Sequence, residues 1–400
     1  EPWRQTFVFF IVNSYRSAGQ KTLRPVLHRV QWSLKAAFEG LRPSVGPDCN
    51  AESIPLRHRR LGKKLCRQFA LTEFKGDWEY HQMIFQLVTK WNGRFICHLC
   101  RASRRPLDGA KCFSLFGAHH QRRSCVESIV ECMPPAPVPL ILVPGYHPAL
   151  IKFCGMHTLA LGIVQTANAE SLLWMYDHGV HADTQDLDTH LRHSYLDFRQ
   201  WLSRHGLSCS GRMFNSKRIH WPGAEFPFLA YKAFNGRIVA AWAASVLCSA
   251  QVQAKITERK PLETDEAYSQ RMHLNSIITS CMYELAEFHN DLECCGRYLS
   301  EPEAMQLYRR GMVFLYLFRE AALIYNRRRE LRFQLRPKLH ALEELLRSIK
   351  VERYNPRFFQ NYTEESFLGN LKILAVKAIA STPKRFEHTM LARYMLRTGV

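Results

Sequence analysis

The sequence lacks any long hydrophobic segment, and we expect no leader that would direct the chain to a membrane. Its apolar run at residues 6–12 is far shorter than the roughly 20 residues that a transmembrane helix requires. A charged lead-in followed by a cleavage site is also absent, so neither a signal peptide nor a membrane anchor is predicted. We therefore expect a soluble, intracellular protein.

The number of cysteines is odd, and the sequence has no internal repeat. The 13 cysteines include four that stand singly in apolar or helical stretches, where a small buried thiol is the commonest role: Cys66, Cys209, Cys248 and Cys281. A disulfide framework is therefore not expected. The chain opens at Glu1 without an initiator methionine, which is typical of a piece cut from a longer polypeptide.

Positive charge is what the sequence has in excess. The 55 Lys and Arg against 35 Asp and Glu give a formal net charge of +20. Such a field favours a polyanion as partner, and nucleic acid is the first candidate. The alternative is a protein whose basic character is incidental. With 46% hydrophobic residues over 400 positions, the chain can bury one large core or two modest ones.

The first quarter of the chain has the pattern of an α/β fold. Residues 6–13 are β-branched and aromatic and predict a buried strand, and residues 21–40 predict an amphipathic helix that ends at a glycine. Residues 66–74 predict a second strand. Strand, helix and strand in this order make one crossover unit of an α/β sheet.

The remainder of the chain is predicted to be helical after a loop and a linker. Residues 97–132 are loop-like, and the proline-rich stretch 134–139 marks the clearest boundary. From residue 159 onwards, apolar residues recur at helical spacing. The predicted helices cover residues 188–205, 234–256, 266–291, 301–329, 336–349 and 364–380.

Two acidic residues stand where either a functional role or helix capping would place them. Asp77 follows the second predicted strand, at the edge where α/β folds display functional side chains. Aspartate is also a preferred helix N-cap, and the local sequence alone favours the cap. Glu365 lies in the first turn of a predicted helix, where the helix dipole favours acids in any case.

Cysteine and histidine pairs indicate a metal site. Cys97 and Cys100 have the spacing that lets two thiolates bind one zinc ion, and Cys154 and His157 offer a second pair, so a Cys3His site can be written. Unligated loop residues are the alternative, because a lone CxxC pair is common. The ligand set stays open, since further candidates lie nearby: Cys112, His119, His120 and Cys125.

Basic clusters are candidate contacts for phosphates. One lies in the loop, where it could fold against DNA, and one lies near the end of a predicted helix. For the helical cluster, which comprises Arg327, Arg328, Arg329 and Arg332, a solvated charged face is an equally good explanation. The candidate nucleic-acid-binding residues are His119, His120, Arg122, Arg123, Arg327 and Arg328.

The order of the motifs resembles a known family. In chain order they are Gly-Asp-Trp at 76–78, the CxxC pair, AHHQRR at 118–123, CGMHTLALG at 154–162, PKLHALEEL at 337–345 and YTEESFLGNLK at 362–372. This order resembles the transposases of CACTA-type (En/Spm-like) DNA transposons. The resemblance covers about residues 60 to 385, thinly between the motifs.

The resemblance implies a fold of the α/β plus α class, an RNase H-like mixed sheet core interrupted by a large α-helical insertion. The core would occupy residues 1–96 and 336–400, and the insertion residues 141–335. Asp77 matches the second acid of the family and Glu365 the final one. The first acid has no match in the sequence and would lie on a strand before Glu1.

The resemblance also implies an activity. An active enzyme would use Mg²⁺ ions held by Asp77 and Glu365 to cleave and join double-stranded DNA in the nucleus. These two carboxylates are then expected to approach each other. The alternatives are a non-catalytic, transposon-derived zinc and nucleic-acid-binding protein, and a helical protein-interaction domain. A homo-oligomer stays open, and no membrane partner is expected.

Overall fold

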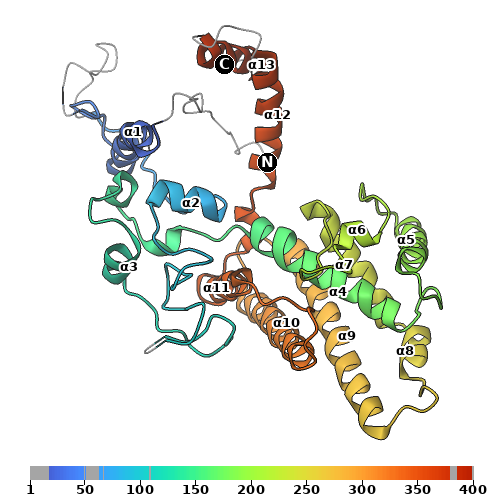
Figure 1. Cartoon of the computed structure of the whole chain (residues 1–400). Helices are drawn as coiled ribbons and strands as arrows, with labels where there is room; N and C mark the ends of the chain where they lie inside the picture. Colours follow the sequence, from blue (N-terminus) through green and yellow to red (C-terminus); the bar gives the residue numbers. More distant parts are fainter. Residues whose placement is uncertain are drawn as a thin grey trace. The chain divides into compact units, whose positions relative to one another are not determined.

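The computed structural model of the chain describes residues 18–48, 50, 63–65, 67–107, 110–378 and 385–398, without the side chains of residues 363–365, 377 and 397–398. It divides the chain into two compact units (Figure 1). The first comprises Glu1–Val88, Ser124–Ile151 and Asn361–Val400. The second comprises Thr89–Arg123 and Lys152–Gln360.

The predicted RNase H-like mixed sheet core is wrong. Among the described residues the structure has no β-strand, and its extended segments meet only in isolated bridges such as the one between Phe74 and Ile151. The first predicted strand, residues 6–13, lies outside the described residues. The second is mostly exposed, with 60% of Phe69 accessible, so residues 67–74 lack the buried face that a sheet requires.

The first unit is built from helices with clear start and stop signals. Helix α1 spans Gln20–Glu39 and ends at Gly40, whose φ of 66° suits glycine, so the predicted stop is confirmed. Helix α2 (Trp78–Phe85) begins after Asp77, and α3 (Cys125–Cys132) begins with a capping box. The short helix η4 (Pro139–Leu142) packs on α1, and α12 (Tyr362–Ala378) packs on α13 (Phe386–Thr398).

The second unit is a helical bundle, which confirms the predicted helical body. Helix α9 (Asp265–Cys294) makes its largest contact with α10 (Glu301–Arg327), and Figure 1 shows the two side by side. Helix α10 then packs on α11 (Pro337–Glu352). Helix α7 (Ala233–Leu247) packs against both α9 and α4 (Val164–Asp177). The residues of α4 are buried on almost every side of the helix. The remaining helical segments are η5 (Pro148–Leu150, in the first unit), η6 (Met156–Ile163), α5 (Leu187–Arg204), α6 (Ser216–Ile219), α8 (Ala250–Thr257) and η7 (Pro356–Phe359).

One predicted helix is divided in two. The pattern at residues 234–256 forms α7 and α8, which meet at a bend of 65°. The side chain of Ser249 accepts a hydrogen bond from the amide of Val252 and so caps a new helix. No single described helix is long and apolar enough to cross a membrane; only the bent pair α7 and α8, counted together, reaches that length and composition.

Candidate metal centre

A turn of the second unit presents the two cysteines of the CxxC pair. The amide of Ile96 donates to the carbonyl of Ala102 at 3.1 Å, which closes the turn behind Cys97 and Cys100. The amide of Arg123 donates to the carbonyl of Leu99 at 3.0 Å. The basic segment 121–123 is therefore held alongside the CxxC turn rather than projecting from it.

Helix α11 brings two further donors to the same place. His340 and Glu344 are four residues apart on α11, so both side chains lie on one face of the helix. The Nε2 atom of His340 lies 3.2 Å from Sγ of Cys100, 240 positions away in the sequence. The same ring nitrogen lies 3.5 Å from Oε1 of Glu344.

The four side chains form a compact, buried set of donors. The ligand atoms of Cys97, Cys100, His340 and Glu344 all lie within 4.8 Å of one another. Ligands of a tetrahedral zinc ion with bonds of about 2.0–2.3 Å are roughly 3.3–3.8 Å apart. The distances of 3.2 Å and 3.5 Å from Nε2 of His340 to the donors of Cys100 and Glu344 are close to that range. The amide of Leu99 donates to Sγ of Cys97 at 3.3 Å, a bond that stabilises a thiolate.

The electrostatics of the cluster favour a bound cation. Burial raises the pKa of the Cys97 thiol, but hydrogen bonds with Cys100 and His340 outweigh it and hold that pKa well below its usual value. Burial and the Cys97 thiolate raise the pKa of Cys100 well above its usual value. Although burial lowers the pKa of His340, its bonds to Cys97 and Glu343 raise it to about 10. The imidazolium balances the thiolate, and a metal ion would take over that role by displacing the proton.

A second group of donors shares His340. Oε2 of Glu343 lies 3.0 Å from Nδ1 of His340 and 3.7 Å from Nε2 of His120. His120, His340 and Glu343 are all buried, and their ligand atoms also lie within 4.8 Å of one another. Burial raises the pKa of Glu343, yet the bond from His340 and its charge bring that pKa down to about 2, so the carboxylate is ionised.

Most of the predicted DNA-binding loop is bound inside the protein. His120 is 3% exposed, and the buried guanidinium of Arg123 donates to the carbonyls of Cys97 and Cys100. The side chain of Arg122 is 46% exposed, but its Nη1 lies 2.6 Å from Oε1 of Glu344. His119 remains exposed. In this arrangement His120 and Arg123 are out of reach of a phosphate group.

The helical basic cluster is divided between surface and core. Arg327 and Arg328 are exposed at the carboxyl end of α10, as a phosphate-binding role requires. Arg332, in contrast, is buried and bound to Glu170, so a solvated face does not describe the whole cluster.

Cys154 and His157 form a pair of their own. They lie at the start of η6, with 3.3 Å between Sγ of Cys154 and Nδ1 of His157. Across the described side chains, neither residue belongs to either donor group, and nor do Cys112, His119 or Cys125. His340 and Glu344 stand in the positions predicted for Cys154 and His157. The sequence does carry a signal for them, because histidine and glutamate four residues apart share one face of a helix.

Of the two predicted catalytic acids, Asp77 and Glu365, only Asp77 has a described side chain. Oδ1 of Asp77 accepts a hydrogen bond from the amide of Tyr80 at 2.6 Å, so Asp77 is the N-cap of α2. Glu365 lies in α12, and its side chain is outside the described residues. The capping role considered for Asp77 is therefore the one that the structure shows.

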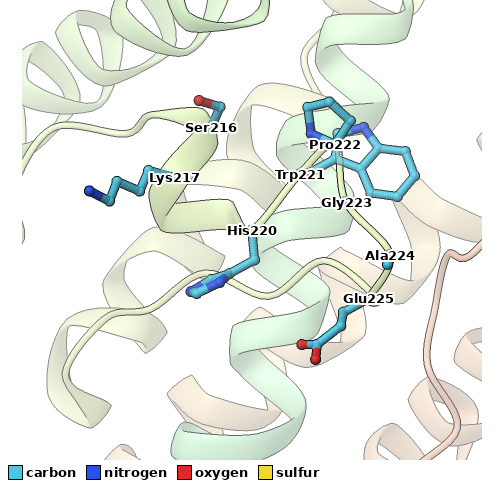
Figure 2. A pocket seen from close by; sticks show the side chains of 8 residues that line it. All are labelled: Ser216, Lys217, His220, Trp221, Pro222, Gly223, Ala224 and Glu225. Atoms are coloured by element: carbon cyan, nitrogen blue, oxygen red, sulfur yellow. The ribbon is translucent and has the colours of Figure 1, made fainter.

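Two surface hollows of the second unit hold no comparable group of donors among the described residues. One of about 430 Å³ is lined by α6 and the loop that follows it, and Figure 2 shows that the charged side chains of Lys217 and Glu225 do not point toward one another. Another of about 580 Å³ is lined by residues of α5, α7 and α8, among them Asp197, Arg204 and Lys255. Asp197 there already accepts a hydrogen bond from Trp242 at 2.8 Å.

Comparison with known proteins finds no match to the chain among family models, curated proteins or solved structures. What the protein does must therefore be inferred from its own residues, above all from the buried donor cluster.

Proposed function

We propose that this chain is a zinc-stabilised helical protein in which Cys97, Cys100, His340 and Glu344 hold one zinc ion. The mutual approach of their four donor atoms to within 4.8 Å carries the proposal. Two thiolates, an imidazole and a carboxylate form a donor set that suits tetrahedral zinc. Mg²⁺ takes octahedral oxygen ligands and does not suit this cluster.

The proposed role of the zinc ion is structural. All four donors are buried and all come from the protein, so the coordination sphere has no position for a substrate. Glu344 can accept from Arg122 and still ligate a cation, because a carboxylate has several lone pairs on its two oxygens. The ion would join the CxxC turn to α11 and stabilise that part of the second unit.

Metal analysis of the purified protein tests this proposal. We expect one zinc per chain, lost in Cys97→Ser and His340→Ala, and a lower melting temperature when a strong chelator removes the metal. Cys248→Ser is the matched control, because Cys248 is an exposed free cysteine outside the cluster. A parent protein that takes up no zinc, or a Cys97→Ser variant that keeps it, would contradict the proposal.

We further propose that the protein binds double-stranded DNA through its phosphates, without strand-transfer chemistry. The net charge of +20 and the exposed arginines at the end of α10 support a phosphate-binding surface. Asp77 serves as a helix cap, and the described residues contain no sheet on which a cluster of catalytic acids could be mounted. A DNA-binding protein without catalytic chemistry fits these observations better than an active transposase.

The salt dependence of DNA binding tests the second proposal. With about five or six phosphate contacts, the logarithm of the binding constant should fall by roughly five units per tenfold rise in salt. Replacing Arg327 and Arg328 by alanine should flatten that slope by about two units. Arg353→Ala is the control, because Arg353 is exposed but already paired with Glu301 at 2.8 Å. A parent slope near zero would refute DNA binding, and an unchanged slope in the double variant would refute this surface.

A further inference from the structure

Glu343 lies behind His340, on the side of the ring that faces away from the cysteines. Nε2 of His340 is 3.2 Å from Sγ of Cys100, whereas Nδ1 of the same ring is 3.0 Å from Oε2 of Glu343. The carboxylate of Glu343 also accepts from Gly117 and Arg347, so it is the acceptor here and the proton of this bond lies on Nδ1. Nε2 is then the nitrogen that faces the donor cluster, and it would offer its lone pair to a metal ion that displaces its proton.

We propose that Glu343 is the positioning residue of the metal centre, which orients His340 and fixes its tautomer so that Nε2 ligates the ion. This inference rests on the zinc site proposed above. Metal-ligating histidines commonly donate their second ring N–H to a carboxylate in this way, and that bond raises the basicity of the ligand. Glu343 would act through His340 and would not touch the metal.

The carboxylate of Glu343 is itself held in place from two sides. Its Oε1 atom accepts from the amide of Gly117 at 2.9 Å and from Nη2 of Arg347 at 3.3 Å. Gly117 has a φ of 69°, and a Cβ there would lie 3.2 Å from Cζ of Tyr316 and closer still to its hydroxyl. Glycine suits both the positive φ and the lack of space beside Tyr316. The hydrogen bond from this amide to Glu343 therefore depends on a glycine at position 117.

The alternative to a positioning role is that Glu343 is itself a metal ligand, in a second site with His120 and His340. Neither ring nitrogen of the buried His120 makes a hydrogen bond within the described part of the chain. Against a second ion, Oε2, the oxygen of Glu343 that faces His120, already accepts a hydrogen bond from Nδ1 of His340, and Arg347 brings a competing positive charge. His340 could bind two ions only as an imidazolate, without the Nδ1 proton. One ion with an outer carboxylate is the simpler arrangement.

Cobalt substitution and zinc competition with a chromophoric chelator test the proposal. We expect one Co²⁺ per parent chain with an intense d–d spectrum typical of tetrahedral sulfur ligation, and zinc affinity weakened by about 10–100-fold in Glu343→Ala. Glu343→Gln keeps the side-chain volume but removes the charge, and should show a shifted cobalt spectrum with a smaller loss of affinity. Glu352→Gln is the matched control on the same helix, because that glutamate pairs with Lys152.

The outcomes separate this proposal from the zinc site itself. A parent protein that binds neither Co²⁺ nor zinc refutes the zinc site and the role of Glu343 with it. A parent that binds one ion, together with Glu343→Gln of parental affinity and spectrum, refutes only the positioning role. Two ions per parent chain would also overturn it, in favour of a second metal site at His120. If Glu343→Ala does not fold, the Glu343→Gln comparison decides.

Discussion

Replacing Arg332 by methionine should strongly destabilise the second unit. The guanidinium of Arg332 is buried against the carboxylate of Glu170, which is 0% exposed, and its Nη1 lies 3.2 Å from Oδ2 of Asp177. Methionine keeps much of the side-chain length and removes the charge. Glu170 would retain the hydrogen bond from the amide of Phe333 but lose the positive charge that balances its own.

The expected loss is large because a single buried charge would remain. Removing one partner of a buried ion pair costs about 3–5 kcal/mol. A unit of this size loses about 2–4 °C of melting temperature per kcal/mol, so the transition should fall by roughly 6–20 °C. Adding Glu170→Gln to Arg332→Met should recover part of the loss, because no unpaired charge is then left in the core.

The loss should depend on pH in a defined direction. Burial raises the pKa of Glu170, and the guanidinium of Arg332 opposes that rise. Without Arg332 the folded-state pKa of Glu170 therefore rises further above its unfolded value. A folded-state pKa above the unfolded one stabilises the protein at low pH, and this stabilisation is lost as the pH rises through the folded-state pKa. The difference in the free energy of unfolding between Arg332→Met and the parent should therefore become smaller as the pH is lowered from about 8 towards 5.

Urea unfolding followed by circular dichroism at two pH values measures both effects. Parent, Arg332→Met, Glu170→Gln and the double variant form a complete cycle. The reasoning is refuted if Arg332→Met stays within about 1 kcal/mol of the parent, a loss expected of an ordinary surface pair. It is also refuted if the free energies of unfolding of Arg332→Met and the parent differ by the same amount at both pH values.

Two further predictions concern helix packing and acid stability. Gly311→Ala should cost about 1–3 kcal/mol, because a Cβ there would press on the fully buried Leu346, whose Cγ lies 3.0 Å away. Gly369→Ala, where no atom of the described residues lies within 4 Å of the new Cβ, should instead stabilise α12 by up to about 1 kcal/mol. Calorimetry of both variants checks that the two effects on stability have opposite signs. Hydrogen bonds from Arg271 lower the pKa of Glu263 to about 2, so the stability that they provide above the ordinary value of 4.5 is lost as the pH falls towards 2. Melting temperatures of parent and Glu263→Gln should therefore converge over that interval, and a constant difference between them would contradict the assignment.

The helices of the second unit could be predicted from the sequence because apolar spacing reports burial directly. The break between α7 and α8 could not, since apolar residues continue through residues 234–256 and the bend depends on the cap at Ser249. The predicted strand at residues 66–74 failed for a different reason. Aromatic and β-branched composition does not reveal whether a segment has a face to bury, and Phe69 is exposed.

Half of the candidate metal centre could be predicted. The spacing of Cys97 and Cys100 is a local signal, but their partners are brought in by the packing of α11 and were assigned instead to the next suitable pair along the chain. Arg123 and His120 illustrate the same limit, because a basic loop has the same sequence whether it faces DNA or holds a turn together. Only the fold shows that Arg123 bonds to the carbonyls behind the cysteines.

X-ray absorption at the zinc edge of the metal-loaded protein tests the central claim most directly. A site of Cys97, Cys100, His340 and Glu344 predicts two sulfur neighbours at about 2.3 Å and two nitrogen or oxygen neighbours at about 2.0–2.2 Å. In His340→Ala the imidazole signal should disappear from the absorption spectrum, and the signal of the sulfur neighbours should weaken or disappear. A shell of nitrogen and oxygen alone, a shell of three or four sulfurs, or protein that retains no zinc would contradict the account.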